Sequence, residues 1–204
     1  MAALQHLRSR ATLVRHGETE WSLSGRHTGR TEVPLTAHGE DGARALAPHL
    51  KVLVFSRVLT SPRLRAQRTC ALAGLQGAEI EPDLAEWDYG DYEGLRSSEI
   101  LALRPGWNIF ADGCPGGETP DDVGARADRL IARLRAAGGD VALFSHGHFG
   151  RVLATRWIGL PVIEGQHFAL SVASMSVLAC DPSHPETSAI TLWNFSPSVN
   201  PWSA

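Results

Sequence analysis

The stretch that decides the fold is ATLVRHGET, residues 11–19. Its first half is apolar and β-prone, which predicts a buried strand over residues 11–15. Arg15, His16 and Gly17 follow at the carboxyl end of that strand. Because ligands in open α/β sheets bind beyond the carboxyl ends of the strands, these residues mark a candidate site. The stretch therefore predicts an α/β fold and a functional position within it.

A second stretch, DVALFSHG at residues 140–147, repeats the pattern. An apolar strand is followed by His146 and Gly147, and a helix is predicted from there to about residue 158. The glycines after both histidines let a ligand approach backbone N–H groups, and the positive end of the helix points at an anion. We therefore expect His16 and His146 to meet over the sheet.

The rest of the chain alternates short strand-like runs with helical patterns, which is typical of a sheet with helices on both faces. Further strands are predicted at 52–61, in a short segment before residue 82, at 174–180 and at 188–195. Helices are predicted from an N-cap at Thr36 to about 50, from an N-cap at Ser61 to about 72, near 97–104, and from an N-cap at Thr119. The length fits one domain, 1–204, with core motifs at about 11–195 and a loosely held tail at 196–204.

Composition excludes several classes of function. The net charge is -3 and the pI is about 6.3, so nothing in the bulk charge attracts nucleic acid or an anionic membrane. Lys51 is the single lysine and does not follow a glycine-rich loop, which excludes a nucleotide-binding P-loop. The three cysteines are widely spaced and are predicted to be reduced thiols. With no apolar leader segment at the N-terminus, we expect a cytoplasmic protein.

Two more clusters supply the remaining chemistry. Arg65 and Arg68 follow the strand predicted to end near residue 60, and a guanidinium suits a phosphate group. Glu86 and Asp88 lie in a long irregular region and supply carboxyl groups for proton transfer. Each of these residues alone has an ordinary structural interpretation, so the hypothesis depends on their joint placement at strand ends. The other histidines are predicted to have surface or packing roles: His6, His27, His38, His49, His167 and His184.

Five ordered segments resemble the histidine phosphatase (phosphoglycerate mutase-like) superfamily. They are LVRHGET (13–19), SPRLRA (61–66), LAEWDYGDYEG (84–94), GGET (116–119) and FSHG (144–147). The resemblance implies a three-layer α/β/α sandwich with a mostly parallel sheet. It also implies a metal-independent phosphomonoesterase, with no cofactor, that acts on a small phosphate ester.

The resemblance implies a role for each matching residue. His16 would take the phosphoryl group, Arg15, Arg65 and His146 would hold it, and Glu86 would give a proton to the leaving group. Phosphoryl transfer depends on positioning and charge stabilisation, which such a clamp supplies. The residues expected to bind substrate are Arg15, Ser22, Thr28, Gly29, Arg65, Gly147 and His148.

The sequence departs from the family pattern at three positions. Ser22 stands where many members have an asparagine that contacts phosphate, and its hydroxyl can substitute as a donor. Gln67 and Arg68 appear in swapped order, which leaves the role of Arg68 open. His148 is either a contact to substrate at the rim or a surface histidine. Segments 21–36, 86–94 and 107–119 are similar to the sedoheptulose 1,7-bisphosphatase branch, which implies a sugar phosphate or bisphosphate substrate.

Three alternatives remain open in the sequence. A phosphoglycerate mutase would return the phosphoryl group to its substrate, but the usual adjacent arginine pair is missing, since Arg96 and Arg104 are separated. A metal-dependent hydrolase could use His146 and His148 with other ligands, although fixed cations nearby would repel the metal. A non-catalytic binding module of the same fold would be expected to lose a nucleophile or acid.

Overall fold

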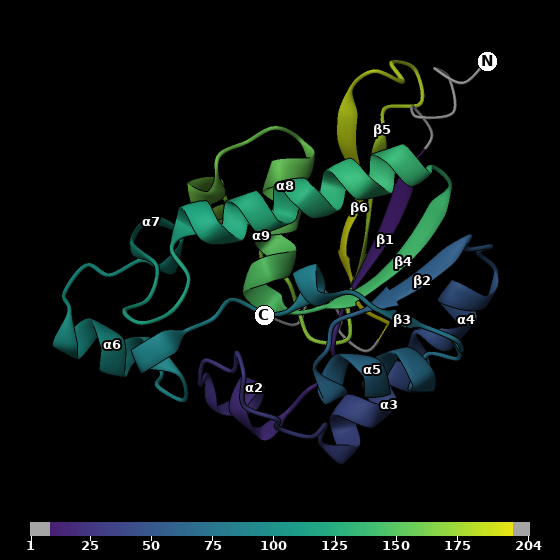
Figure 1. Cartoon of the computed structure of the whole chain (residues 1–204). Coiled ribbons are helices and arrows are strands. Elements are labelled where there is room, and N and C mark those ends of the chain that lie inside the picture. The colour runs from purple at the N-terminus through teal and green to yellow at the C-terminus, as the bar shows by residue number, and fades with distance from the viewer. Residues whose placement is uncertain (1–8, 198–204) are drawn as a thin grey trace.

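The computed structural model describes residues 9–197, which form one mixed sheet with helices on both faces (Figure 1). The strand order is β3-β2-β4-β1-β5-β6. The strands are β1 (Arg10–Arg15), β2 (Arg57–Thr60), β3 (Glu79–Ile80), β4 (Asp140–Ser145), β5 (Met175–Cys180) and β6 (Ser188–Phe195). The four strands β3, β2, β4 and β1 run parallel, and β5 and β6 are antiparallel to their neighbours. The predicted α/β sandwich with a mostly parallel sheet is confirmed.

The helices separate into two layers, because successive side chains of a strand point to opposite faces. Leu13 and Leu143 pack in one core cluster with residues of α8 (Pro120–Ala137) and α9 (Gly147–Trp157). Val14 and Phe144 pack in a second cluster with residues of α4 (Ala47–Lys51) and α5 (Leu64–Leu72) and with Leu46, which precedes α4. The helices are α2 (Glu20–Ser24), α3 (Ala37–Ala45), α4 (Ala47–Lys51), α5 (Leu64–Leu72), α6 (Ser97–Leu103), α7 (Ile109–Asp112), α8 (Pro120–Ala137) and α9 (Gly147–Trp157), with short 3-10 turns at Pro82–Leu84, Gly90–Tyr92 and Val162–His167.

The register of β1 against β4 creates the candidate site. Val14 lies opposite Phe144 and Arg15 opposite Ser145, so the two strands end level with one another. The next residue of each chain segment is a histidine, His16 after β1 and His146 after β4. The predicted meeting of the two histidines over the sheet is therefore a direct result of strand register.

Three predicted elements differ from the structure. The expected helix 36–50 is two helices, because Pro48 lacks the N–H that would continue the first one and instead stands in the first turn of α4. The expected strand 52–61 begins only at Arg57, and Val52 and Val54 lie exposed in the connection. Helix α5 begins at Leu64 with Arg63 at its N-cap position, whereas Ser61 was expected to cap it.

The N-caps at Thr36 and Thr119 are confirmed, since each side chain accepts a backbone N–H of the first helical turn. The helix near 97–104 is also confirmed, as α6. Residues 198–204 of the expected tail and His6 lie outside the described residues. Within residues 9–197, no helix combines the length and the apolar character needed to cross a membrane.

Candidate active site

His16 and His146 form the centre of the site. Their ring centroids lie 5.2 Å apart at an interplanar angle of 63°. Nδ1 of His16 lies 2.7 Å from the carbonyl oxygen of Gly17, which can only accept a hydrogen bond. Nδ1 therefore carries the proton and Nε2 keeps its lone pair. The segment that precedes β5 fixes the backbone of His16, since the N–H of Ala173 donates to the carbonyl of His16.

Both imidazoles are held in the neutral form. Burial, followed by the charges of Arg65 and Arg15, lowers the pKa of His16 well below its usual value of 6.5. The pKa of His146 is lowered well below 6.5 by burial and by Arg65, His16 and Arg15. A neutral imidazole with a free Nε2 lone pair is a nucleophile, so the site supplies His16 in its reactive state.

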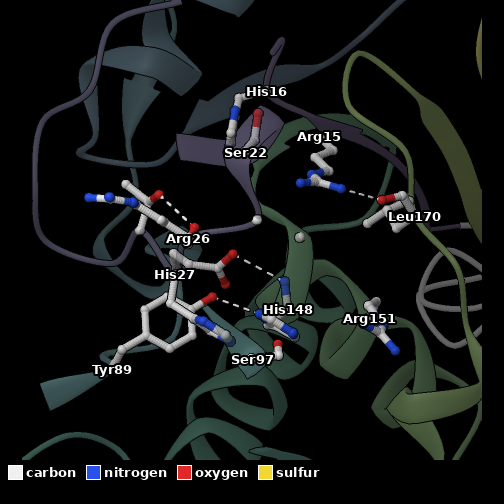
Figure 2. A pocket seen from close by; sticks show the side chains of 14 residues that line it. Arg15, His16, Ser22, Arg26, His27, Tyr89, Ser97, His148, Arg151 and Leu170 are labelled. Atoms are coloured by element: carbon white, nitrogen blue, oxygen red, sulfur yellow. Dashed lines mark hydrogen bonds between the residues drawn. The ribbon is translucent and has the colours of Figure 1, made fainter. Parts of the chain in front are cut away.

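Two arginines lie beside the histidines, and the charge of Glu86 acts on both without a direct ion pair. Arg65, from α5, is 1% exposed and donates to the carbonyls of Thr28, Gly29 and Thr31. Arg15 donates to the carbonyl of Leu170 (Figure 2). Among the residues that the structure describes, neither arginine forms an ion pair with an acidic side chain. Their charges therefore remain available to an anion.

Several buried nitrogens of these residues have no hydrogen-bond partner within residues 9–197. They are Nε of Arg15, Nε of Arg65 and Nδ1 of His146. Buried polar atoms in native proteins almost always have a partner, and an arginine Nε–H is always a donor. All three atoms are sealed from solvent, and Arg65 and His146 do not line the cavity described below. These residues therefore concentrate positive charge and hydrogen-bonding capacity behind His16.

Glu86 lies beside this cluster, in a loop that packs against the first turn of α9. Its Oε1 accepts the N–H groups of Trp87 and Phe149, each at 2.8 Å, and its Oε2 accepts that of His148 at 3.1 Å. Arg126 of α8 fixes the loop that carries it by donating to the carbonyls of Asp83 and Ala85. Among residues 9–197, Glu86 is the one acidic residue that lines the cavity described next.

A cavity of about 190 Å³ opens over His16 (Figure 2). Of the residues predicted from the sequence, Arg15, His16, Ser22, Thr28, Glu86, Gly147 and His148 line it. Gly147 leaves space for the guanidinium of Arg15, since a Cβ at this position would stand 3.3 Å from it. His146 is fully buried behind the wall, where its Nε2 lies 2.7 Å from Oγ of Ser61.

Some expected contacts differ from what the structure shows. Gly29 does not line the cavity, because its backbone packs against Trp87 and its N–H donates to Glu93. The hydroxyl of Ser22 lines the cavity, but it already donates to the carbonyl of Thr19 in the cap of α2. Arg68 forms a surface ion pair with Glu40 rather than joining the site.

Six further side chains line the cavity that the sequence did not indicate: Arg26, His27, Tyr89, Ser97, Arg151 and Leu170. His27 was expected to have only a surface or packing role, but it is both buried and part of the cavity wall. Arg151 lies one helical turn after Gly147 on α9, and this i, i+4 spacing is the signal that could have found it. No acidic side chain within residues 9–197 forms an ion pair with Arg26 or Arg151. Within the same residues, no cluster of three or more potential metal ligands is present.

The buried histidines predict a stability that depends on pH. Burial is the first cause that lowers the pKa of His16, His27, His146 and His148. Below pH 6.5 the unfolded chain binds protons at these residues and the folded chain does not, so stability present above pH 6.5 is lost as the pH falls. Each histidine adds up to about 1.4 kcal/mol per pH unit to this slope. Urea unfolding at pH 7.5 and 5.5 measures the loss, and a slope that His148→Phe leaves unchanged would contradict it.

Comparison with known proteins gives one consistent family. The model of the histidine phosphatase superfamily (branch 1) matches residues 11–194. The chain is 45% identical to an acid phosphatase of Mycobacterium tuberculosis over 172 residues, covering 82% of this chain and 85% of the relative. It is 39% identical to sedoheptulose 1,7-bisphosphatase of Saccharomyces cerevisiae over 189 residues, covering 76% of this chain and 70% of the relative.

A solved structure of the product of the open reading frame Rv3214 of Mycobacterium tuberculosis superposes with a TM-score of 0.87 at 40% identity, covering 92% of this chain and 98% of the other. The family model spans all the motifs that build the site, from the first strand to the last. The chain therefore belongs to the histidine phosphatase superfamily.

Proposed function

We propose that this protein hydrolyses small phosphate monoesters through a phosphohistidine on His16. The observation that carries the proposal is a neutral His16 on the cavity wall beside the guanidinium of Arg15, with the positive charge of Arg65 buried behind them. A phosphoryl group presents several acceptor oxygens and an electrophilic phosphorus in one unit. Its negative charge suits the guanidinium groups, and its phosphorus is the atom that the nucleophile attacks.

In the first step Nε2 of His16 attacks phosphorus, the P–N bond forms and the P–O bond to the leaving group breaks. The hydrogen bond from Nδ1 to the carbonyl of Gly17 orients the ring and partly neutralises the charge that develops on it. Arg15, Arg65 and His146 stabilise the negative charge on the phosphoryl oxygens. Because these donors are fixed before the reaction, little reorganisation is needed in the transition state.

Glu86 is the proposed proton donor to the leaving oxygen. Within the described part of the chain it is the one carboxyl group on the cavity wall, and the loop that carries it is fixed by Arg126. In the second step a water attacks the phosphohistidine, Glu86 takes a proton from that water, and inorganic phosphate leaves with His16 restored. The two steps balance, because the proton that Glu86 gives in the first is regained in the second.

The proposed substrate is a phosphorylated sugar, with a bisphosphate favoured. One relative is named an acid phosphatase and another a sedoheptulose 1,7-bisphosphatase, which supports this class. The cavity wall supports it too, because Arg26 and Arg151 supply positive charge that the first phosphate, at His16, does not use. A cytoplasmic location and the lack of nucleic-acid or membrane partners stay predictions from the sequence.

The direct experiment is a screen of phosphorylated metabolites that measures released inorganic phosphate. We expect turnover of sugar phosphates or bisphosphates, and we expect it to survive EDTA because the arginines supply the positive charge. A loss of activity in EDTA that zinc or magnesium restores would favour the metallohydrolase alternative. Release of phosphate from no ester in the panel would contradict the proposed function.

The fate of the phosphoryl group separates a phosphatase from a mutase. The cavity opens to solvent, and the arginines between Gly94 and Gly117 are separate, with Arg104 paired to Asp112. Water should therefore reach the phosphohistidine before a second acceptor does. On one preparation, release of phosphate from sugar phosphates should exceed interconversion of 3- and 2-phosphoglycerate. Mutase turnover about tenfold faster than phosphate release would reverse the assignment, a barrier difference of roughly 1.4 kcal/mol.

A further inference from the structure

Two imidazoles stack on the cavity wall away from His16. His27, from the loop after α2, and His148, from the first turn of α9, are parallel within 1° with ring centroids 5.6 Å apart. Both line the cavity, and Figure 2 shows Tyr89 beside them. The mechanism on His16 uses none of these three side chains. Their protonation states follow from their hydrogen bonds.

His27 presents an acceptor to the cavity. Its Nδ1 lies 2.8 Å from the carbonyl oxygen of Leu95, so Nδ1 carries a proton and donates it. Burial lowers the pKa of His27 below 6.5, which keeps the ring neutral near pH 7. A neutral ring protonated on Nδ1 has a lone pair on Nε2. His27 can therefore accept a hydrogen bond at Nε2 but cannot donate one.

His148 presents a hydrogen-bond donor to the cavity, because Tyr89 determines which of its nitrogens is protonated. The hydroxyl of Tyr89 lies 2.7 Å from Nδ1 of His148 and makes no other hydrogen bond within residues 9–197. Burial raises the pKa of Tyr89 well above 10, so the phenol keeps its proton. If Nδ1 were protonated as well, the buried phenol proton would have no acceptor. Tyr89 therefore donates, and neutral His148 carries its proton on Nε2.

Both Nε2 atoms are open to a ligand. Neither has a hydrogen-bond partner among residues 9–197, and neither belongs to the atoms there that are sealed from solvent without one. Burial, followed by the charges of His27 and Arg151, lowers the pKa of His148 well below 6.5. Near pH 7 the cavity therefore offers one donor and one acceptor on two parallel rings.

We propose that His27 and His148 form a hydroxyl-recognition pair that selects polyol leaving groups, with Tyr89 as the positioning residue. A hydroxyl both donates and accepts, so it matches a wall that accepts at His27 and donates at His148. A carboxylate has no proton to donate to His27, and its negative charge would be repelled by the lone pair on Nε2 of His27. This inference rests on the proposed function and names which alcohols that function prefers.

The test compares glucitol 6-phosphate with n-hexyl phosphate, which has the same chain length and a primary alkoxide but no hydroxyls. The measured quantity is the ratio of their kcat/KM values, in which effects on phosphoryl transfer cancel. His148→Phe removes the donor and should lower the ratio about tenfold, the cost of roughly one hydrogen bond. His148→Gln, whose amide nitrogen can reach the position of Nε2, should restore most of it. Tyr89→Phe should lower the ratio by about threefold or more, because His148 can then protonate either nitrogen.

His184→Gln is the matched control, because His184 is an exposed histidine in the loop between β5 and β6 and should leave the ratio unchanged. Two-bond ¹H–¹⁵N NMR of the wild type measures which nitrogen of His27 and of His148 is protonated, independently of catalysis. We expect protonation at Nδ1 of His27 and at Nε2 of His148. Protonation of His148 at Nδ1, or an unchanged ratio in the His148 and Tyr89 variants of an active enzyme, would overturn this inference alone. A wild type that hydrolyses neither ester would overturn the proposed function as well.

Discussion

His16→Ala is expected to lower phosphatase turnover by about 10⁴-fold or more, because it removes the atom that forms the covalent intermediate. The remaining clamp of Arg15, Arg65 and His146 is unchanged, so phosphate or vanadate should still bind. Steady-state release of phosphate measures the first effect and calorimetry with vanadate the second. Among the described residues, the His16 ring makes one side-chain hydrogen bond, to the carbonyl of Gly17. Its removal should therefore leave the fold intact.

His184→Ala serves as the control, since this exposed histidine lies away from the cavity. It should retain wild-type turnover. If His16→Ala kept more than about a tenth of the wild-type kcat with intact circular dichroism, His16 would not be the nucleophile.

Glu86→Gln is expected to slow poor leaving groups far more than good ones. A sugar alkoxide needs a proton as it leaves, so its hydrolysis should fall by about 10²- to 10³-fold. p-Nitrophenolate needs little protonation, and its release should fall less than about tenfold. The difference between the two substrates isolates proton transfer from general damage to the site.

Asp88→Asn is the matched control for this prediction. Asp88 pairs with Arg30 and does not line the cavity, so its removal should slow both substrates equally little. Equal slowing of the two substrates by Glu86→Gln would move the proton-donor role away from Glu86, and selective slowing by Asp88→Asn would assign it there.

The strands and the histidine pair could be predicted because local sequence determines them. A buried strand needs an apolar run, and the run in β1 stops at Arg15 just as that in β4 stops at Ser145. The predictions of secondary structure were wrong where packing with residues distant in the sequence determines whether a strand or helix forms. Val52 and Val54 are strand-forming residues with no neighbour to pair with, so they lie in a connection.

The inner part of the site was predictable and the outer part was not. His16 and His146 follow the ends of strands, and Glu86 lies in a loop motif that packs against the first turn of α9. Arg26, His27 and Tyr89 come from loops whose path depends on tertiary contacts, such as the hydrogen bond from His27 to Leu95. Ser22 shows the same limit, because its position was predicted while its engagement with Thr19 was visible only in the structure.

Rapid-quench analysis with ³²P-labelled substrate detects the covalent intermediate itself. We expect a phosphoprotein that forms within one turnover, is labile in acid and stable in base, and carries its label on the peptide containing His16. In His16→Ala that labelled species should be absent. A base-labile adduct, a label on another residue, or single-turnover release of phosphate with no phosphoprotein at any time would exclude a phosphohistidine on His16.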